Sequence, residues 1–142
     1  MSNNYFRFKQ FTVQQDKAAM KVTTDSCLFG AWVAKRISEQ PGTAIQLLDI
    51  GTGTGLLSIM IAQKNTHCTI DAVEIERNAY EQALENVMNS PWKEKIHVLH
   101  TDIKLFEPGK KYDIIISNPP FYEKELKAEN ENKNIAHHNS GL

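Results

Sequence analysis

The feature that most constrains the fold is a glycine-rich turn, Asp49-Ile-Gly51-Thr-Gly53-Thr-Gly55, which lies between two apolar segments. Residues 45–50 before it have the length and apolar character of a buried strand. Residues 56–62 after it are apolar on nearly all sides, as in a helix packed against a sheet. A turn in this position is where a parallel α/β sheet binds a nucleotide-like ligand, and a Cβ atom at Gly51 or Gly53 would occupy the space of that ligand. The sequence therefore predicts an α/β domain with a ligand site at this turn.

Strand and helix patterns continue to alternate after the turn. Residues 69–74, 96–100 and 112–117 read as further strands, and a helix is expected from about residue 78 until Asn89-Ser90-Pro91 ends it. Helices that alternate with strands in this way indicate a mostly parallel sheet. The chain of 142 residues has the length of a single domain.

The spacing of the glycines favours some ligands over others. A dinucleotide fingerprint GxGxxG counted from Gly51 would need glycine at position 56, where the chain has Leu56, and no GxxxxGK[ST] motif for a phosphate-binding loop is present. Glu74 ends the second core strand 21 residues after Gly53, close to the distance at which a carboxylate reaches ribose hydroxyls. Asp71 and Glu76 are rival candidates for that role. Asp102, after the third strand, either accepts from an adenine amine or only forms a turn.

A second motif, Asn118-Pro119-Pro120-Phe121, leaves the end of the fourth core strand. In a doubly wound sheet this strand lies beside the first, so the motif is expected to face the glycine turn. The prolines have no N–H donors, so this corner presents carbonyl acceptors and the Asn118 side-chain oxygen, which suits an amine substrate. Phe121 is placed to stack on a planar ring. The alternative is a proline-rich exit from a strand with a surface aromatic.

These motifs together resemble the amino-methyltransferases that use S-adenosylmethionine on a seven-stranded Rossmann-like sheet. The segments at 8–16, 20–25 and 28–32 further resemble the bacterial tRNA1(Val) (adenine-37-N6)-methyltransferase family, so that the likeness covers the whole chain. The resemblance implies S-adenosylmethionine as cofactor and N6 of an adenine in the tRNA anticodon loop as target. It also implies these residue roles: cofactor binding by Asp49, Gly51, Gly53, Gly55, Glu74, Asp102 and Asn118, and catalysis by Asn118, Pro119 and Phe121.

Several alternatives stay open at this point. The tetrapeptide also occurs in methyltransferases that act on guanine N2 of ribosomal RNA, on DNA adenine and on a protein glutamine. A chain that binds the cofactor without turnover is the alternative from another class. The Thr24-Asp25 pair either closes over the methionine end of the cofactor or leaves Asp25 as a simple helix cap.

The resemblance implies the strand order 3-2-1-4-5-7-6, of which only strands 1 to 4 are found before Phe121. We therefore expect an incomplete catalytic domain with a Rossmann-like, mostly parallel sheet of order 3-2-1-4 and no C-terminal strands. The apolar fourth strand would be an edge, which favours self-association or marginal stability. Binding of S-adenosylhomocysteine without efficient tRNA methylation is the expected behaviour.

The remaining chain divides into three parts within this one domain. Residues 1–42 are expected to form a hairpin, with residues 6–14 pairing to 20–22, and a helix with Cys27, Leu28, Ala31 and Trp32 on one face. Residues 43–122 are the expected cofactor-binding core. Residues 123–142 form a polar tail, expected to be mobile or helical near residue 135, with seven charged residues and only five apolar ones.

The net charge of −1 hides a basic N-terminal quarter, since residues 1–36 carry six basic and two acidic residues. Arg7, Lys9, Lys17 and Lys21 are expected either to form a rim that contacts phosphates or to be a solvated strand face. No histidine pair has zinc-site spacing, so no metal is expected. No apolar run approaches the roughly 20 residues of a membrane span, and the N-terminus lacks a signal peptide. We therefore expect a cytoplasmic protein without a membrane partner.

Overall fold

A four-stranded sheet forms the centre of the computed structural model, which describes residues 4–18, 21–40 and 42–119. Its strands are β3 (Ile45–Ile50), β4 (Cys68–Glu74), β5 (Ile96–His100) and β6 (Ile114–Ser117). They lie in the order β5-β4-β3-β6, and all three pairings are parallel. Since β3 is the first core strand along the chain, the predicted order 3-2-1-4 is confirmed.

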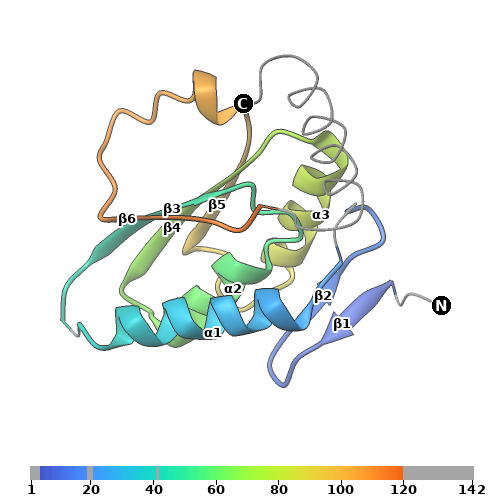
Figure 1. The fold of residues 1–142 in the computed structure, drawn as a ribbon, viewed down its shortest axis with the longest axis horizontal. Coiled ribbons are helices and arrows are strands. Elements are labelled where there is room, and N and C mark those ends of the chain that lie inside the picture. The colour runs from blue at the N-terminus through green and yellow to red at the C-terminus, as the bar shows by residue number, and fades with distance from the viewer. Residues whose placement is uncertain (1–3, 19–20, 41, 120–142) are drawn as a thin grey trace, which may run out of the picture.

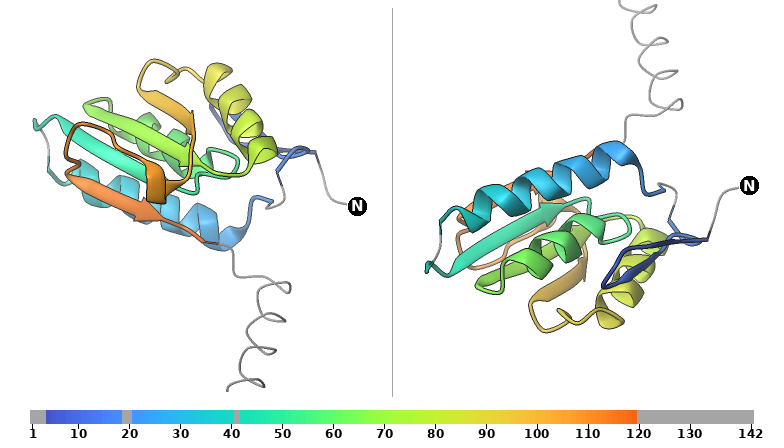
Figure 2. Two further views of the ribbon diagram at one scale, coloured as in Figure 1. Left: turned by 90° about the horizontal axis from the view of Figure 1, so that it is seen from above. Right: turned by 90° about the horizontal axis from the view of Figure 1, so that it is seen from below.

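The helices gather on one face of this sheet (Figures 1 and 2). Helix α2 (Leu56–Lys64) connects β3 to β4, and α3 (Arg77–Met88) connects β4 to β5. Both right-handed crossovers step in the same direction and so fall on the same face. Helix α1 (Thr24–Ser38) packs beside α2. The return from β5 to β6 steps the other way, so residues 101–113, with the short helix η1 (Ile103–Leu105), cross the opposite face.

The core lies between the sheet and the helices. Leu47 of β3 and Ile70 of β4 are fully buried in one apolar cluster with Ile59 and Ile61 of α2. Five residues in succession are buried at the end of β4. Burial on both faces is typical of a strand inside a parallel sheet, and here it includes the carboxylates Asp71 and Glu74.

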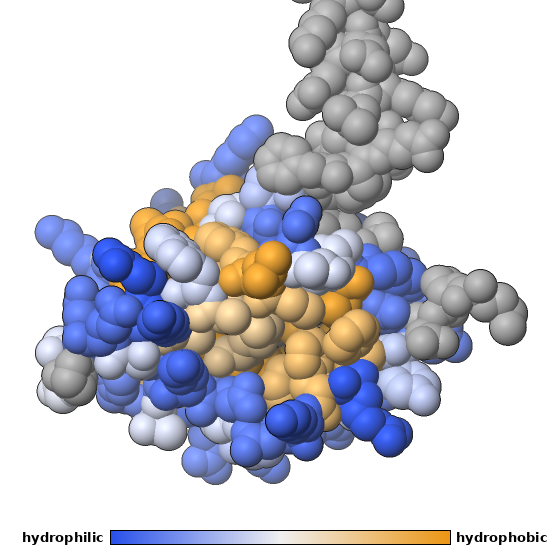
Figure 3. Space-filling model, turned by 60° about the horizontal axis from the view of Figure 1, so that its bottom comes forward, coloured by the Kyte–Doolittle hydropathy of each residue, from blue (hydrophilic) through white to orange (hydrophobic). Residues whose placement is uncertain are grey.

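Helix α1 buries a different face from the one its sequence suggested. Leu28 and Trp32 are 64% and 61% exposed, whereas Val33, Ala34 and Ile37 are buried. Gly30 lies on the buried face, where a Cβ atom would stand 2.6 Å from the Met60 sulfur of α2. The absence of that Cβ leaves room for the side chains of α2 against α1. Figure 3 shows an apolar surface on the side of the molecule that carries α1 and α2.

The N-terminal hairpin is present, but its second strand differs from the one expected. Strand β1 (Tyr5–Arg7) pairs antiparallel with β2 (Thr12–Gln14), and the chain turns within residues 8–11. The predicted pairing with residues 20–22 is wrong for 21 and 22, because the Val22 N–H donates to Gln15 Oε1 (2.9 Å) and not to a ladder. Residue 20 lies outside the described residues.

Among the described residues, no helix is long and apolar enough to cross a membrane. Within the same ranges, no three His, Cys, Asp or Glu side chains gather in a way that could hold a metal ion. The expectations for the polar tail fall on residues outside the description. The division at residues 42 and 122 stays a prediction.

Candidate active site

The glycine turn opens a pocket at the carboxyl edge of the sheet. Gly51 and Gly53 adopt left-handed backbone conformations, with φ of +70° and +60°, and a Cβ atom at either would point into open space. Gly55 differs, since it is buried and a Cβ atom there would meet the Ala83 backbone of α3 at 3.6 Å. Gly51 and Gly53 therefore leave room for a ligand, whereas Gly55 lets the turn pack on α3.

A buried carboxylate holds the turn from below. Asp49 is completely buried, and its Oδ2 accepts hydrogen bonds from the hydroxyls of Thr52 (2.8 Å) and Ser58 (2.7 Å). Oδ1 is buried without a hydrogen-bond partner. Burial raises the pKa of Asp49 to about 6, against the lowering effect of the two hydroxyls, and the negative charge of Glu74 adds to the rise. Asp49 thus shapes the turn from beneath and does not face the solvent.

Glu74 lies at the end of β4, beside the turn. Its Oε1 accepts from the Gly53 N–H (2.9 Å) and its Oε2 from the Glu76 N–H (3.0 Å). A carboxylate oxygen can accept more than one hydrogen bond, so both keep capacity for ligand hydroxyls. The Thr101 N–H donates to the Glu74 carbonyl (3.1 Å), which brings the half-buried Asp102 close to the same edge. Asp102 itself caps η1 by accepting from the Lys104 N–H (2.9 Å).

The two rival carboxylates are engaged elsewhere. Glu76 caps α3 by accepting from the N–H groups of Asn78 (3.1 Å) and Ala79 (2.7 Å). Asp71 lies in the middle of β4, where its Oδ2 accepts from the Tyr112 hydroxyl (2.6 Å) and pairs with Lys110 (2.9 Å). Burial acts to raise the pKa of Asp71, but these partners outweigh it and hold the pKa below its usual value. Glu74 is therefore the carboxylate that remains beside the turn.

Asn118 lies beside the glycine turn, at the end of the strand that pairs with β3 on the side opposite β4. It directly follows β6, whose Ser117 pairs with Ile50 at the end of β3. Asn118 lines one pocket together with the turn residues 51–54. Pro119 follows it and is exposed, whereas Phe121 lies outside the described residues.

The N-terminal segment closes this pocket with residues that the sequence did not single out for it. Val22 and Ser26 line it, as does Lys21, which was expected at an RNA rim. The helix cap is Thr23, whose side chain accepts from the Ser26 N–H (3.1 Å). The interpretation of Asp25 as a cap is therefore wrong, and Asp25 is exposed in the first turn of α1. The signal that was available is the Thr23-x-x-Ser26 spacing of a capping box.

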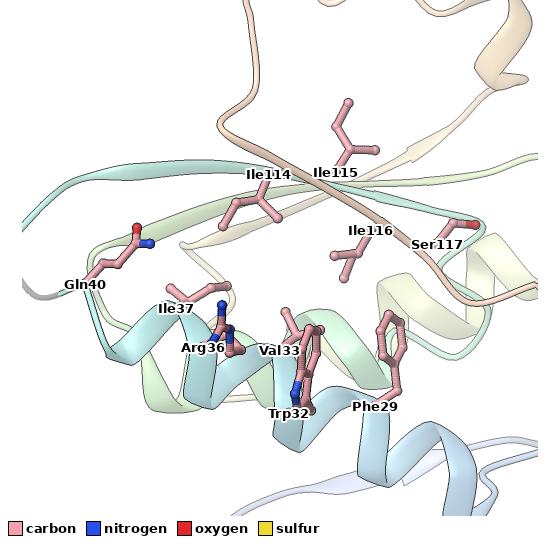
Figure 4. A pocket seen from close by; sticks show the side chains of 10 residues that line it. All are labelled: Phe29, Trp32, Val33, Arg36, Ile37, Gln40, Ile114, Ile115, Ile116 and Ser117. Atoms are coloured by element: carbon pink, nitrogen blue, oxygen red, sulfur yellow. The ribbon is translucent and has the colours of Figure 1, made fainter.

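A second and more apolar hollow lies apart from the pocket at the glycine turn. It is a groove between α1 and the edge strand β6, and Figure 4 shows Ile114 and Ile116 pointing toward α1 while Ile115 points away. Apolar side chains make up most of its lining. Because the groove is separate from the glycine turn, whereas the turn and Asn118 line the smaller pocket, we place the candidate site at the smaller pocket.

Fold and site together define a Rossmann-like α/β protein with a ligand pocket at the carboxyl edge of its sheet. The chain belongs to the methyltransferase small domain family, which it matches over residues 30–139. The Rossmann-like, mostly parallel fold class and the assignment to a methyltransferase, both expected from the motifs, are thereby confirmed.

Individual relatives agree with this assignment. The chain is 49% identical over 140 residues to a protein of Dyadobacter fermentans named tRNA1(Val) (adenine(37)-N6)-methyltransferase, covering 99% of this chain and 56% of the relative. A protein of Cytophaga hutchinsonii with the same name is 51% identical over 144 residues, covering 100% and 58%. This chain thus spans little more than half the length of either relative. The catalytic domain of human METTL16, solved with an RNA hairpin, shares the fold, with a TM-score of 0.63 at 23% identity over 86% of this chain and 43% of that one.

Proposed function

We propose that the pocket binds S-adenosylmethionine and that the chain takes part in transfer of its methyl group to N6 of an adenine in the tRNA anticodon loop. One observation carries the proposal: Asn118 and the glycine turn, 63 or more residues apart in sequence, line the same pocket. The names of the two relatives support the choice of substrate. Unpaired anticodon-loop bases are accessible to an enzyme that must reach an exocyclic amine.

The residues present fit this cofactor. Open space at Gly51 and Gly53 leaves room for it, and Glu74 offers acceptors for two ribose hydroxyls at the adjacent strand end. Asp102 provides an acceptor for an adenine amine near Glu74. The cofactor, when bound, supplies both an activated methyl group and the leaving group. The protein therefore needs mainly to position the target amine and to polarise it.

Asn118 and Pro119 are the proposed residues for the amine. An amine on an aromatic ring is a poor nucleophile, because its lone pair is delocalised into the ring. The Asn118 side-chain oxygen and the Pro119 carbonyl would each accept one N–H of this amine, which favours a pyramidal nitrogen and frees the lone pair. Phe121 would stack on the ring, a role proposed from the motif alone.

Basic residues of the hairpin are proposed to contact the RNA backbone. Arg7 and Lys9 are exposed, and the Arg7 guanidinium lies 5.9 Å from the Tyr5 ring centroid. The other two candidates have partners within the protein, since Lys17 pairs with Glu85 (3.3 Å) and Lys21 donates to the Gln15 carbonyl. Arg7 and Lys9 are therefore the stronger candidates. A tRNA substrate places the protein in the cytoplasm.

Self-association through β6 is a further part of the proposal. Within the described residues β6 is an edge of the sheet, and its four residues, Ile-Ile-Ile-Ser, include no charge and no proline. Charged residues and prolines usually keep an edge strand from pairing with another chain, and β6 has neither. A second copy of the same strand is the proposed partner.

Methyl transfer from radiolabelled S-adenosylmethionine, offered with separate pools of tRNA, ribosomal RNA, DNA and peptides, tests the proposed reaction. Calorimetry with S-adenosylhomocysteine tests the cofactor site separately. We expect S-adenosylhomocysteine to bind and the transferred label, although slow to accumulate, to appear in tRNA. Label in another pool contradicts the tRNA assignment. Binding without label in any pool selects the alternative, a chain that holds the cofactor without turnover.

A further inference from the structure

Two amide side chains are buried on α3, whereas two of its large apolar side chains are exposed. Gln82 and Asn86 are 0% and 1% exposed, whereas Leu84 and Met88 are 36% and 55% exposed. A buried amide without partners is costly, so the contacts of these two side chains explain why this face of α3 is polar. The groups outside α3 that hold both amides by hydrogen bonds belong to the backbone.

Asn86 binds two segments that are far apart in sequence. Its Oδ1 accepts from the Gln14 N–H (2.7 Å), and its Nδ2 donates to the Gln14 carbonyl (2.8 Å), at the end of strand β2. The same Nδ2 donates to the carbonyl of Thr54 (2.8 Å), which belongs to the glycine turn and lines the pocket. One fully buried side chain thus joins the N-terminal hairpin to the turn.

Gln82, one helical turn earlier, contacts only the first of these segments. Its Oε1 accepts from the Lys17 N–H (2.8 Å), just beyond β2, and its Nε2 donates to Glu85 of the same helix (3.1 Å). The two amides therefore form a matched pair on one helix face. Asn86 holds the end of β2 and Gln82 holds the segment just after it, and only Asn86 also has a bond to the glycine turn.

We propose that Asn86 is a positioning residue that couples the glycine turn to the N-terminal hairpin. The proposal rests on the proposed function, which assigns cofactor binding to the glycine turn and RNA binding to the hairpin. A ligand that fixes the turn also fixes the Thr54 carbonyl, and so holds Asn86 in the position that binds Gln14. Occupation of the cofactor pocket and order at the hairpin then rise together, as reciprocal coupling requires.

Hydrogen exchange with and without S-adenosylhomocysteine tests the coupling in the full chain. In the wild type, we expect the ligand to slow exchange at the Gln14 amide, which donates to Asn86. Asn86→Asp keeps the shape of the side chain, but as a carboxylate it cannot donate to Thr54 or Gln14. We expect this variant at pH 8 to lose the ligand-induced slowing at Gln14 and to bind S-adenosylhomocysteine about tenfold more weakly.

Gln82→Glu is the matched control, because it makes the same amide-to-acid change one turn away. We expect it to keep the ligand-induced slowing at Gln14 and an affinity within about twofold of wild type. A pH series adds a readout that a general loss of packing would not produce. As pH falls and the carboxylate introduced by Asn86→Asp protonates, the acid can donate again, so the affinity ratio of wild type to variant should return toward one.

The outcomes separate this inference from the proposed function. If the wild type does not bind S-adenosylhomocysteine, the proposed cofactor is wrong. Hydrogen exchange without ligand then tests the coupling by itself, through the amides of Gln14 and of Gly55, whose N–H belongs to the same peptide group as the Thr54 carbonyl. The coupling requires that Asn86→Asp speeds exchange at both amides. It also requires that Gln82→Glu leaves exchange at Gly55 unchanged. If the wild type binds but both variants lose affinity equally, or the slowing at Gln14 is absent or survives in Asn86→Asp, the coupling role is wrong.

Discussion

Asn118 is the side chain on which the proposed chemistry most depends, because its proposed role in transfer is to polarise the target amine, while Glu74 is proposed to bind the ribose of the cofactor. Asn118→Ala should leave S-adenosylhomocysteine affinity unchanged while the single-turnover rate of transfer to tRNA falls roughly 10²–10³-fold, or about 3–4 kcal/mol. That is the expected loss for one polarising hydrogen bond. Calorimetry and transfer of radiolabelled methyl groups measure the two quantities separately.

Glu74→Ala serves as the opposite control for this prediction. It should weaken the binding of S-adenosylhomocysteine by about 1–3 kcal/mol, because the ribose hydroxyls lose their acceptor. Equal losses of affinity and rate in Asn118→Ala would contradict the role given to that residue. Unchanged affinity of Glu74→Ala for S-adenosylhomocysteine would mean that another acceptor binds the ribose hydroxyls.

Asp49 gives the stability of the fold a specific dependence on pH. Its folded pKa, about 6, lies above its ordinary value of 3.8, so the folded state binds more protons than the unfolded state between these values. The contribution of this group to stability is present below about pH 4 and is lost as pH rises through 6. A shift of about two units corresponds to roughly 3 kcal/mol.

Asp49→Asn removes the ionisable group and keeps an acceptor for Thr52 and Ser58. The free energy of unfolding of Asp49→Asn minus that of the wild type should therefore rise between about pH 4 and about 6.5 and be flat above. Urea unfolding across this range measures the difference directly. Parallel pH profiles for the two proteins would show that Asp49 titrates alike in the folded and unfolded states.

The site residues differ in how far sequence could predict them. Gly51, Glu74 and Asn118 each follow or end a strand, so the rule that ligands bind at the carboxyl edge of a parallel sheet was enough to bring them together. Gln82 and Asn86 were not predictable in the same way. Glutamine and asparagine on a helix ordinarily face water, and only the backbone of two distant segments makes their burial favourable here.

Helices α1 and α3 show the same limit for whole elements. The breaker Asn89-Ser90-Pro91 predicts where α3 ends, and the observed helix, Arg77–Met88, begins within a residue of the expected position. The buried face of α1 does not follow from its large apolar side chains, because Leu28 and Trp32 are exposed while Val33 is buried. On α3, likewise, two amides are buried while Leu84 and Met88 are exposed. Periodicity predicts a helix well, but the neighbouring element decides which face it buries.

The hairpin of β1 and β2 is the element proposed to meet RNA, and salt dependence is its test. Changing both Arg7 and Lys9 to Ala removes two exposed cations from one end of it. Affinity for tRNA should fall, and the slope of log affinity against log salt should decrease by about one for each phosphate that the variant no longer neutralises. Affinity measured by fluorescence anisotropy over a series of salt concentrations gives that slope.

Lys17 and Lys21 provide the comparison for this test, since both already have partners within the protein. Changing Lys17 to Ala should alter the salt slope less than the Arg7 and Lys9 pair does. An unchanged slope after the double change at Arg7 and Lys9 would mean that other residues bind the phosphates.

On the scale of the whole molecule, the described residues cover the two faces and two edges of the sheet unequally. Three helices cover one face, and residues 101–113 cross the other (Figure 2). At the edge, β6 presents Ile115, which is 60% exposed and points away from α1 (Figure 4). On its other side, Ile114 and Ile116 line the apolar groove. An edge of this kind favours pairing with a second copy.

Ile115→Lys tests whether β6 is the surface through which copies associate. Sedimentation velocity over a series of protein concentrations should show dimers that dissociate on dilution for the wild type and monomers for the variant, because like charges face one another when the edges pair. Leu105→Lys is the matched control, with the same change of charge at a residue that is 78% exposed on η1, outside strand β6. It should leave association unchanged. A wild type that is monomeric at every concentration, or equal effects of both variants, would mean that β6 is not the surface through which copies pair.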